Sequence, residues 1–305
     1  MKHSDVLLLG GGGFLGTALA NFLSQKGRRL HLIGPSHFSR TPPNIFIHQG
    51  KLDDTQLLND ILPLCNTVFH LASASRPSDS AEHPIMEGVL NILPTLKFVE
   101  VMQGYKDIQI IFMSSGGALY GEPLFDPIRE RHPFSPRSYY GAGKASIEAF
   151  LSVFAKNEGQ QVVILRPSNL YGPGQPLRKD FGFIRTMLDH MLHGSMMEIW
   201  GDGEVKRDFV FIDDMVRLCS QLATEPIGTE VYNVGYGAGY SLNQVIGIAE
   251  SVIGRKIRVV YRPERNIDVR NVSLDCSRIQ KNLGWKPEVT LEQGIRRTWE
   301  WMESL

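Results

Sequence analysis

The sequence predicts an α/β protein: a doubly wound parallel sheet followed by a smaller C-terminal α/β domain. Three observations support this prediction. A buried apolar run leads into a glycine cluster, apolar runs then alternate with stretches of helical periodicity, and this alternation ends after Arg166. Strands that alternate with helices form open parallel sheets with right-handed crossovers.

The expected strands of the first half are continuous apolar runs, which are typical of parallel strands covered on both faces. They lie at Val6–Leu9, Leu30–Ile33, Thr67–Leu71, Gln109–Met113 and Val162–Leu165. The expected helices carry apolar residues three or four positions apart. They lie at Phe14–Lys26, Thr55–Leu64, Ile85–Gln103 and Gly143–Lys156, with two more in the last third at Leu242–Ile253 and Leu291–Met302.

The composition excludes several classes of protein. Of 305 residues, 42% are hydrophobic and 21% are charged, which excludes intrinsic disorder and collagen-like repeats. Lys and Arg number 32, as do Asp and Glu, so no net field favours nucleic acid or an anionic membrane. The longest apolar runs are too short to span a bilayer. We therefore expect neither a nucleic-acid partner nor a membrane partner.

The cysteines and the N-terminus bear on location. Cys65, Cys219 and Cys276 have no metal-ligand spacing and cannot form a disulfide framework. We expect them to be inert thiols in a reducing compartment, and we expect no metal site. No signal peptide precedes the first apolar run, so a cytoplasmic protein is expected.

The glycine cluster Gly10–Gly16 follows an expected strand and opens an expected helix. Residues without side chains allow a tight turn and let a pyrophosphate approach the backbone, while the helix N-terminus supplies free N–H groups. Two glycine registers fit, one from Gly10 and one from Gly11. The alternative is a tight strand-to-helix turn without a ligand. Because strand and helix are both in place, the cluster favours a dinucleotide-binding domain of the Rossmann type.

The acidic residue that usually ends the second strand of such a domain is missing, and Gly34 takes its place. A carboxylate there would bind the adenosine ribose, whereas Ser36 and Arg40 can accommodate a 2′-phosphate. Arg40 can equally be a solvated loop charge. Both NAD and NADP therefore stay open at this point.

Tyr140 and Lys144 are four residues apart at the start of an expected helix. Residues at this spacing share one helix face, so the phenol and the ammonium can point at one spot. We expect the ammonium, helped by the positive charge of an oxidised nicotinamide, to draw the phenol pKa from about 10 toward neutrality. Tyr140 could then act as a general base.

Together these motifs resemble the extended short-chain dehydrogenase/reductase family, in particular nucleotide-sugar 4-epimerases of the UDP-glucose 4-epimerase type. The resemblance covers nearly the whole chain, with nine motifs in family order. They are Gly10–Gly16, Phe69–Ala72, Asn91–Thr95, Ser114–Gly121, Glu130–Lys144, Arg166–Pro173, Gly201–Asp214, Arg265–Val269 and Leu283–Pro287.

The resemblance implies roles for individual residues. Tyr140 would be the base and Lys144 would hold the nicotinamide ribose. His70 would order the cofactor pocket, and the other cofactor-binding residues would be Gly10, Gly13, Phe14, Leu15, Gly16, Ser36, Arg40, Leu52, Leu71, Ala72 and Asn91. Asn169, Arg207 and Arg265 would bind the nucleoside diphosphate, the arginines through charge-assisted bonds; their alternatives are a turn residue and surface ion pairs.

The chain departs from the family pattern near the site. Gly116 stands where the family usually has a Ser or Thr hydroxyl, and Ala118 replaces another common hydroxyl. We expect Ser115 or Ser114 to supply the missing hydrogen bond, and we assign Ser115 to catalysis and substrate binding. Lys51 replaces an acid that usually contacts the adenine.

The resemblance implies a Rossmann domain over residues 1–168, with a returning segment near 205–235. Residues 169–204 and 236–305 would form the substrate-binding domain. It also implies a homodimer built on the helices at Ile85–Gln103 and Gly143–Lys156.

The preferred hypothesis is a nucleotide-sugar 4-epimerase that holds NAD and acts through a 4-keto intermediate on UDP-glucose and UDP-galactose or their N-acetylhexosamine equivalents. An NADPH-dependent 4-ketoreductase of a nucleotide-linked deoxysugar is the main alternative. A 4,6-dehydratase is disfavoured, because that branch carries an Asp-Glu pair where this chain has Gly117 and Ala118. A non-catalytic nucleotide sensor is disfavoured by the presence of both Tyr140 and Lys144.

Overall fold

The computed structural model describes residues 4–34, 41–75, 84–178, 182–264 and 269–305. These residues form two compact units. Unit 1 takes its residues from 1–119, 136–166 and 216–232, and unit 2 takes its residues from 120–135, 167–215 and 233–305. Each unit therefore gathers segments that are distant in the sequence.

The centre of unit 1 is a seven-stranded sheet in the order β10-β6-β5-β4-β1-β2-β3. The pairs from β3 to β6 are all parallel. The central strands are buried along their whole length, which explains their unbroken apolar runs. The strands are β1 (Asp5–Leu9), β2 (Leu30–Ile33), β3 (Ile45–His48), β4 (Cys65–His70), β5 (Gln109–Met113), β6 (Val162–Pro167) and β10 (Glu230–Val234).

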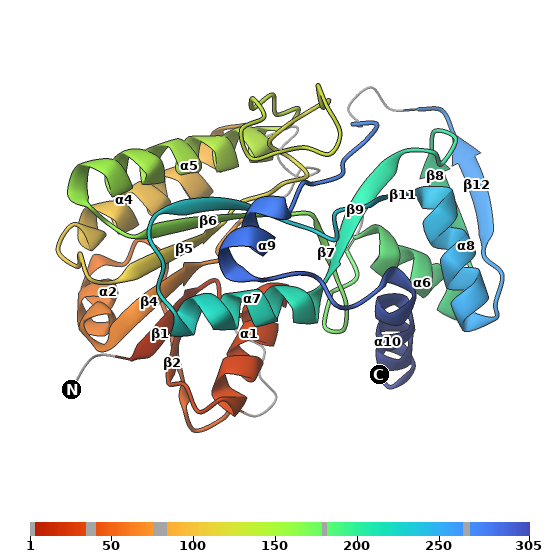
Figure 1. Cartoon of the computed structure of the whole chain (residues 1–305). Coiled ribbons are helices and arrows are strands. Elements are labelled where there is room, and N and C mark those ends of the chain that lie inside the picture. The colour runs from red at the N-terminus through yellow and green to blue at the C-terminus, as the bar shows by residue number, and fades with distance from the viewer. Residues whose placement is uncertain (1–3, 35–40, 76–83, 179–181, 265–268) are drawn as a thin grey trace. The chain divides into compact units, whose positions relative to one another are not determined.

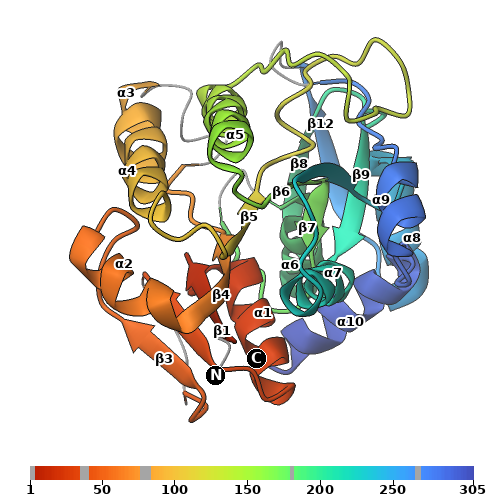
Figure 2. The same cartoon turned by 60° about the vertical axis from the view of Figure 1, so that its left-hand side comes forward.

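Helices cover both faces of this sheet (Figures 1 and 2). On one face lie α2 (Thr55–Ile61), α4 (Leu93–Met102) and α5 (Tyr139–Glu158), whose apolar side chains form one core cluster with alternate strand residues. On the other face lies α1 (Phe14–Gln25). Layers of helix, sheet and helix confirm the predicted fold class.

One predicted helix is wrong in detail. The expected continuous helix over Ile85–Gln103 is three elements: α3 (Pro84–Glu87), a π-helical turn η3 (Gly88–Ile92) and α4. Pro94 lies in the first turn of α4 and has no N–H to donate. A π turn often absorbs such an interruption, and π turns are frequent at functional sites. The predicted helix over Thr55–Leu64 likewise ends in a 3₁₀ turn, η1 (Leu62–Leu64).

Unit 2 is built from short elements. A three-stranded sheet has the order β11-β9-β7, and β8 and β12 form a parallel pair. Helices α6, α8 and α10 pack against one another. The elements are β7 (Asn169–Tyr171), α6 (Phe183–His193), β8 (Met196–Trp200), β9 (Lys206–Phe211), β11 (Gly239–Ser241), α8 (Leu242–Ile253), β12 (Arg258–Arg262), α9 (Ser277–Leu283) and α10 (Leu291–Glu303). Helix α7 (Ile212–Thr224) begins in unit 2 and belongs to unit 1 from Val216 onward.

Two buried aspartates organise the irregular segments of unit 2. The Asp208 carboxylate accepts hydrogen bonds from the backbone N–H groups of Tyr236, Gly237 and Leu274. Burial raises the pKa of Asp208 to about 6, although these three bonds lower it. The Asp214 carboxylate accepts bonds from the backbone of residues 288 and 289 in the same way. Each of these two carboxylates thus fixes backbone segments that are far from it in the sequence.

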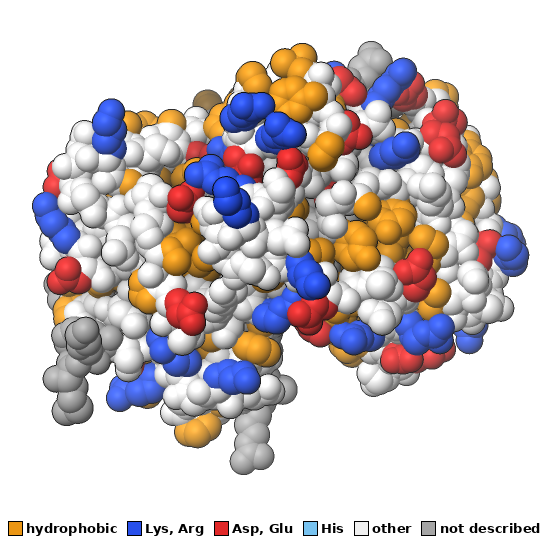
Figure 3. Space-filling model, in the orientation of Figure 1, with side chains coloured by type: hydrophobic (Ala, Val, Ile, Leu, Met, Phe, Trp, Pro, Cys, Tyr) orange, Lys and Arg blue, Asp and Glu red, His pale blue; other side chains and the backbone are white. Residues whose placement is uncertain are grey.

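Acidic and basic side chains are interspersed over the face shown in Figure 3, in keeping with the balanced composition. No helix within the described ranges is long and apolar enough to cross a membrane.

Candidate functional site

The glycine turn between β1 and α1 is closely packed. Gly10 has a φ of +83°, and a Cβ at this position would lie 2.7 Å from the Cα of Ala72. A Cβ at Gly16 would lie 2.6 Å from the carbonyl oxygen of Gly10. Both positions therefore require glycine. The turn also brings Gly10 against Leu71 and Ala72, which were predicted to share the cofactor site.

Helix α1 begins without a side-chain cap, because its N-cap residue is Gly13. Its first N–H groups are therefore available to a bound anion, as in sites that hold a pyrophosphate. Phe14 and Leu15 are the first two residues of this helix. The local geometry fits the diphosphate of a dinucleotide.

The structure describes the adenosine end of the predicted site only in part. Gly34 follows β2 and has a φ of +116°. Ser36 and Arg40 lie outside the described residues. Leu52 lies after β3 and packs against the core cluster of unit 1, while the Lys51 side chain is exposed.

Tyr140, Lys144 and Ser115 lie together in unit 1. Ser138 caps α5 by accepting a hydrogen bond from the backbone N–H of Gly141, which fixes the first turn of the helix. The side chains of Tyr140 and Ser115 are hydrogen-bonded to each other. The Lys144 Nζ atom lies 5.8 Å from the centre of the Tyr140 ring. The Ser115 hydroxyl thus lies at the phenol of Tyr140.

Burial dominates the electrostatics of this group. Burial raises the pKa of Tyr140 to about 12, although its hydrogen bond to Ser115 lowers it. Burial also lowers the pKa of Lys144 to about 8, and the Lys144 Nζ donates to the carbonyl oxygen of Met113 at 2.8 Å. The predicted shift of the phenol pKa toward neutrality also requires the charge of a bound oxidised nicotinamide, so it stays a prediction. Burial is the largest cause of the raised Tyr140 pKa, and the charge of Glu87 acts in the same direction.

Asn91 lies in the π turn and holds the loop that follows β4. Its Oδ1 atom accepts a hydrogen bond from the Ala74 N–H at 2.8 Å, and its Nδ2 atom donates to Ser75 Oγ at 2.8 Å and to Glu87 Oε1 at 3.0 Å. Ser75 Oγ also donates to the Glu87 carboxylate. Glu87 was not predicted from the sequence, although Glu87 and Asn91 are four residues apart, a spacing that suits a shared network.

His70 orders the same region. Thr95 donates its hydroxyl proton to the Asn91 carbonyl at 2.7 Å, so His70 Nε2, 2.9 Å from that hydroxyl, must be the donor to Thr95. Burial, followed by the charge of Lys144, lowers the pKa of His70 to about 3. His70 is therefore neutral and joins the end of β4 to the π turn.

The residues predicted to bind substrate lie on neighbouring strands of unit 2. Asn169 on β7 pairs with Phe209 on β9, and its Nδ2 atom donates to the carbonyl of Asp208 at 2.9 Å. Arg207 on β9 donates to the carbonyl oxygens of Lys206 and Val269. Arg265 lies outside the described residues.

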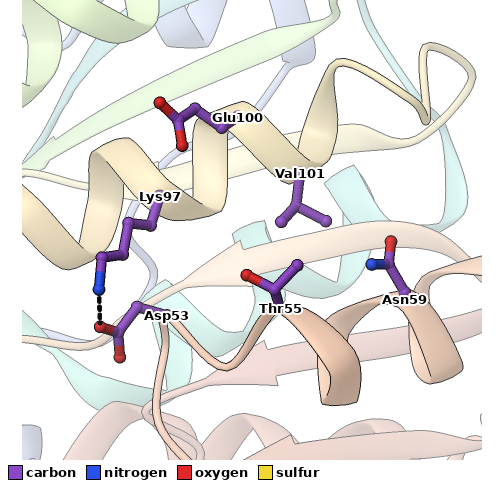
Figure 4. Close-up of a pocket in the computed structure, with 6 residues that line it drawn as sticks. All are labelled: Asp53, Thr55, Asn59, Lys97, Glu100 and Val101. Carbon is purple, nitrogen blue, oxygen red and sulfur yellow. Dashed lines mark hydrogen bonds and ion pairs between the residues drawn. The ribbon is translucent and has the colours of Figure 1, made fainter.

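A further hollow lies between α2 and α4, away from these residues (Figure 4). The Lys97 Nζ atom donates to Asp53 Oδ2 at 3.0 Å across it, and most of its lining is polar. We assign it no chemistry. Among the described residues, no group of three His, Cys, Asp or Glu side chains could hold a metal ion.

Comparisons with known proteins agree with this geometry. Residues 6–235 match the model of the NAD-dependent epimerase/dehydratase family. A putative UDP-glucose 4-epimerase of Methanocaldococcus jannaschii is 32% identical over 98% of both chains. The structure of a Thermotoga maritima UDP-glucose 4-epimerase with UDP-glucose has a TM-score of 0.92 and 33% identity, covering 98% of this chain and 99% of that one. A Thermus thermophilus UDP-glucose 4-epimerase in complex with NAD has a TM-score of 0.89 and 27% identity, covering 98% and 99%.

These findings confirm the predicted resemblance and the NAD cofactor. They also confirm the class of enzyme, an NAD-dependent nucleotide-sugar epimerase.

Proposed function

We propose that this chain, which belongs to the NAD-dependent epimerase/dehydratase family, interconverts the C4 epimers of a UDP-hexose or a UDP-N-acetylhexosamine. One observation carries the proposal: the Tyr140–Ser115 hydrogen bond, with Lys144 one helical turn further on, in a unit that opens with the glycine turn.

The glycine turn and its neighbours would hold the cofactor. Gly10, Gly13, Phe14, Leu15 and Gly16 would bind the diphosphate at the start of α1. Leu71, Ala72 and Asn91 would flank the nicotinamide half, and Leu52 the adenosine half. The chemistry that bound NAD would supply at this site is reversible hydride transfer with C4 of the sugar.

The proton chemistry belongs to α5 and the end of β5. Tyr140 would take the proton of the sugar 4-hydroxyl through its phenol oxygen, and Ser115 would hold that hydroxyl and the phenol in line. Lys144 would bind the nicotinamide ribose with its charged amine. Because burial holds the Tyr140 pKa high, the positive charge of the oxidised nicotinamide is needed before the phenolate can form. Proton transfer would thus be tied to a loaded site.

Substrate binding would fall to unit 2. Arg207 and Arg265 would bind the two phosphates, and Asn169 would orient the nucleotide. The bonds from Arg207 to the Lys206 and Val269 carbonyls support this role, because they fix the position of the guanidinium. We also propose that the predicted domain boundaries separate these two tasks.

The alternative is an NADPH-dependent 4-ketoreductase. One observation favours it: Gly34 replaces the acid that would contact the adenosine ribose, and this opens room for a 2′-phosphate near Ser36 and Arg40. An epimerase regenerates its nicotinamide in each turnover, whereas a reductase consumes it.

The experiment follows from that difference. Purified protein is incubated with UDP-glucose, and the sugars are separated by chromatography while the absorbance of reduced nicotinamide is recorded. We expect UDP-galactose to appear with no net change in that absorbance, and mass spectrometry to find NAD with the protein. The Tyr140→Phe variant is the control. Steady oxidation of added NADPH by a 4-keto sugar nucleotide, without interconversion of 4-epimers, would replace the proposal by the reductase.

We also propose a cytoplasmic homodimer. Exposed apolar side chains follow α3, η3 and α4 at intervals of three or four residues, and two more lie on α5, which contacts those elements. A surface of this kind is typical of a protein interface. Light scattering at micromolar concentration should give a dimer, and Val153→Glu should give a monomer. The surface comprises Ile85, Met86, Val89, Leu90, Leu93, Phe150 and Val153.

A further inference from the structure

Glu87 is a buried carboxylate beside the Tyr140–Lys144 pair. Its exposed fraction is 4%, and it lies at the end of α3. It packs against Gly143 in the first turns of α5, where an added Cβ would lie 2.6 Å from Glu87 Cγ. The missing side chain of Gly143 therefore makes the space that Glu87 fills.

The hydrogen-bond partners of Glu87 are neutral. Ser75 Oγ and Asn91 Nδ2 donate to its two oxygens. Within the part of the chain that the structure describes, no Lys, Arg or His forms an ion pair with it. Neither of its hydrogen-bond partners therefore brings a positive charge to the carboxylate.

Lys144 is a buried amine whose hydrogen-bond partner is also neutral. Its exposed fraction is also 4%, and its Nζ atom donates to a neutral carbonyl, that of Met113. Burial lowers its pKa, while the charges of Glu87 and Glu148 raise it. Glu148 is already bound by Arg166, with 2.6 Å between Arg166 Nη2 and Glu148 Oε2. That ion pair cancels most of the field of Glu148, so Glu87 is left as the effective counter-charge.

We propose that Glu87 is a positioning residue whose buried negative charge keeps the amine of Lys144 protonated, so that Lys144 can bind the cofactor ribose. Only one part of this proposal rests on the proposed function, namely that the charged Lys144 binds the cofactor ribose. The groups that face this pair are Tyr140 on α5 and His70 on β4, both neutral in the chain alone.

The charge of Glu87 also raises the pKa of Tyr140. For Lys144 this favours the charged amine, whereas for Tyr140 it favours the neutral phenol, which cannot accept a proton. Glu87 would therefore hold Lys144 charged and Tyr140 neutral until the positive nicotinamide ring enters. A site without its cofactor would then carry no free phenolate.

The test is a direct titration of Lys144. The full-length protein is prepared with lysine labelled with carbon-13 at Cε, and the Lys144 resonance is assigned by its loss in Lys144→Met. We expect Glu87→Gln to lower the titration midpoint by about one pH unit. Glu87→Asp keeps the charge and should stay closer to wild type. Ser75→Ala removes a neutral partner only and should leave the midpoint unchanged.

A second variant keeps the test valid if Glu87→Gln fails to fold. Gly143→Ala places a methyl group where the Glu87 side chain lies and should move the carboxylate away, with a shift in the same direction. An unchanged midpoint in a folded Glu87→Gln or Gly143→Ala protein would overturn the proposal. The titration needs no substrate, so it stays informative if the epimerase assay fails. If that assay succeeds, the alkaline limb of the rate profile should move with the midpoint.

Discussion

Unit 1 and unit 2 are each stabilised internally by a different kind of interaction. In unit 1, strands such as β1 and β5 are buried along their whole length, and the apolar faces of α2, α4 and α5 cover one side of them. In unit 2 the strands are short, and Asp208 and Asp214 bind the backbone of distant loops. Apolar burial is non-directional, whereas a carboxylate fixes particular N–H groups. Unit 1 therefore gains a rigid frame, and unit 2 gains irregular loops held in defined places.

This contrast suggests a division of labour. The chemistry proposed for Tyr140, Lys144 and Ser115 is placed on the rigid frame. The recognition proposed for Asn169 and Arg207 is placed on β7 and β9 of unit 2. Variants in each unit can test that division, because those in unit 1 should change turnover and those in unit 2 should change binding or stability.

The largest effect is expected in unit 1. Tyr140→Phe removes the proposed proton acceptor and should lower kcat by about 1,000-fold, or about 4 kcal/mol. Affinity for the nucleotide sugar should be nearly unchanged, because the phenyl ring keeps its place. Steady-state kinetics and equilibrium binding measure the two quantities. Residual turnover within about tenfold of wild type, or 1.4 kcal/mol, would exclude Tyr140 as the essential base.

The next effect concerns the stability of unit 2. Asp208→Ala leaves three backbone N–H groups without their acceptor, those of Tyr236 and Gly237 partly buried and that of Leu274 buried, and should lower the free energy of unfolding by about 3 kcal/mol. Urea unfolding at neutral pH measures this loss. If the variant unfolds at the same urea concentration as wild type, the carboxylate does not anchor the loops.

The same variant has a signature in its pH dependence. The pKa of Asp208 is about 6 in the folded chain, above its ordinary value of 3.8. Folding therefore takes up a proton between these values, and this group contributes stability that rises as pH falls from 6 toward 3.8. Asp208→Ala should lack that contribution.

Binding should respond next. Arg207→Ala removes one charge-assisted phosphate contact and should weaken binding of the nucleotide sugar by about 1.5–3 kcal/mol, with NAD binding unchanged. Arg265→Ala should behave alike. Calorimetric titration with UDP and with NAD separates the two ligands. Equal losses for both ligands in both variants would place the arginines on the cofactor instead.

The smallest effect compares a helix cap in each unit. Ser138 caps α5 and Ser241 caps α8, so Ser138→Ala and Ser241→Ala should each cost about 1 kcal/mol of stability. Only Ser138→Ala should also lower kcat, because it loosens the turn that carries Tyr140. Thermal unfolding and initial rates distinguish the two variants. Equal losses of activity in the two variants would contradict the assignment of catalysis to unit 1 and substrate recognition to unit 2.

The contrast also explains what could be predicted from the sequence. The strand at Gln109–Met113 was predicted with its observed bounds, because an unbroken apolar run has few alternatives. The strand at Ile45–His48 was not predicted, since only Ile45 is fully buried at this sheet edge. In unit 2 the predicted helices at Leu242–Ile253 and Leu291–Met302 match α8 and, within one residue, α10. Its short strands were not predicted, and Asp208 and Asp214 look like ordinary polar residues until their loops are seen.

Part of the candidate site was likewise within reach. The four-residue spacing of Tyr140 and Lys144 predicted their closeness. Gly116 pointed to Ser115 or Ser114 as the replacement hydroxyl, and Ser115 is the one hydrogen-bonded to Tyr140. Glu87 was missed, because its place depends on Gly143, a glycine on another helix. Long-range packing of this kind leaves no local signal. The roles assigned to the predicted residues stay predictions.

Gly34 has a consequence for anyone who wishes to redesign cofactor choice. Most attempts would restore the acidic residue that usually grips the adenosine ribose. Space alone would permit this, since an added Cβ would meet its nearest atom only at 3.9 Å. The backbone does not permit it, because a φ of +116° lies in a region that L-amino acids rarely adopt, at a cost on the order of 1–3 kcal/mol. A single substitution at this position would thus strain the loop, and the engineered contact has to be built from a neighbouring segment.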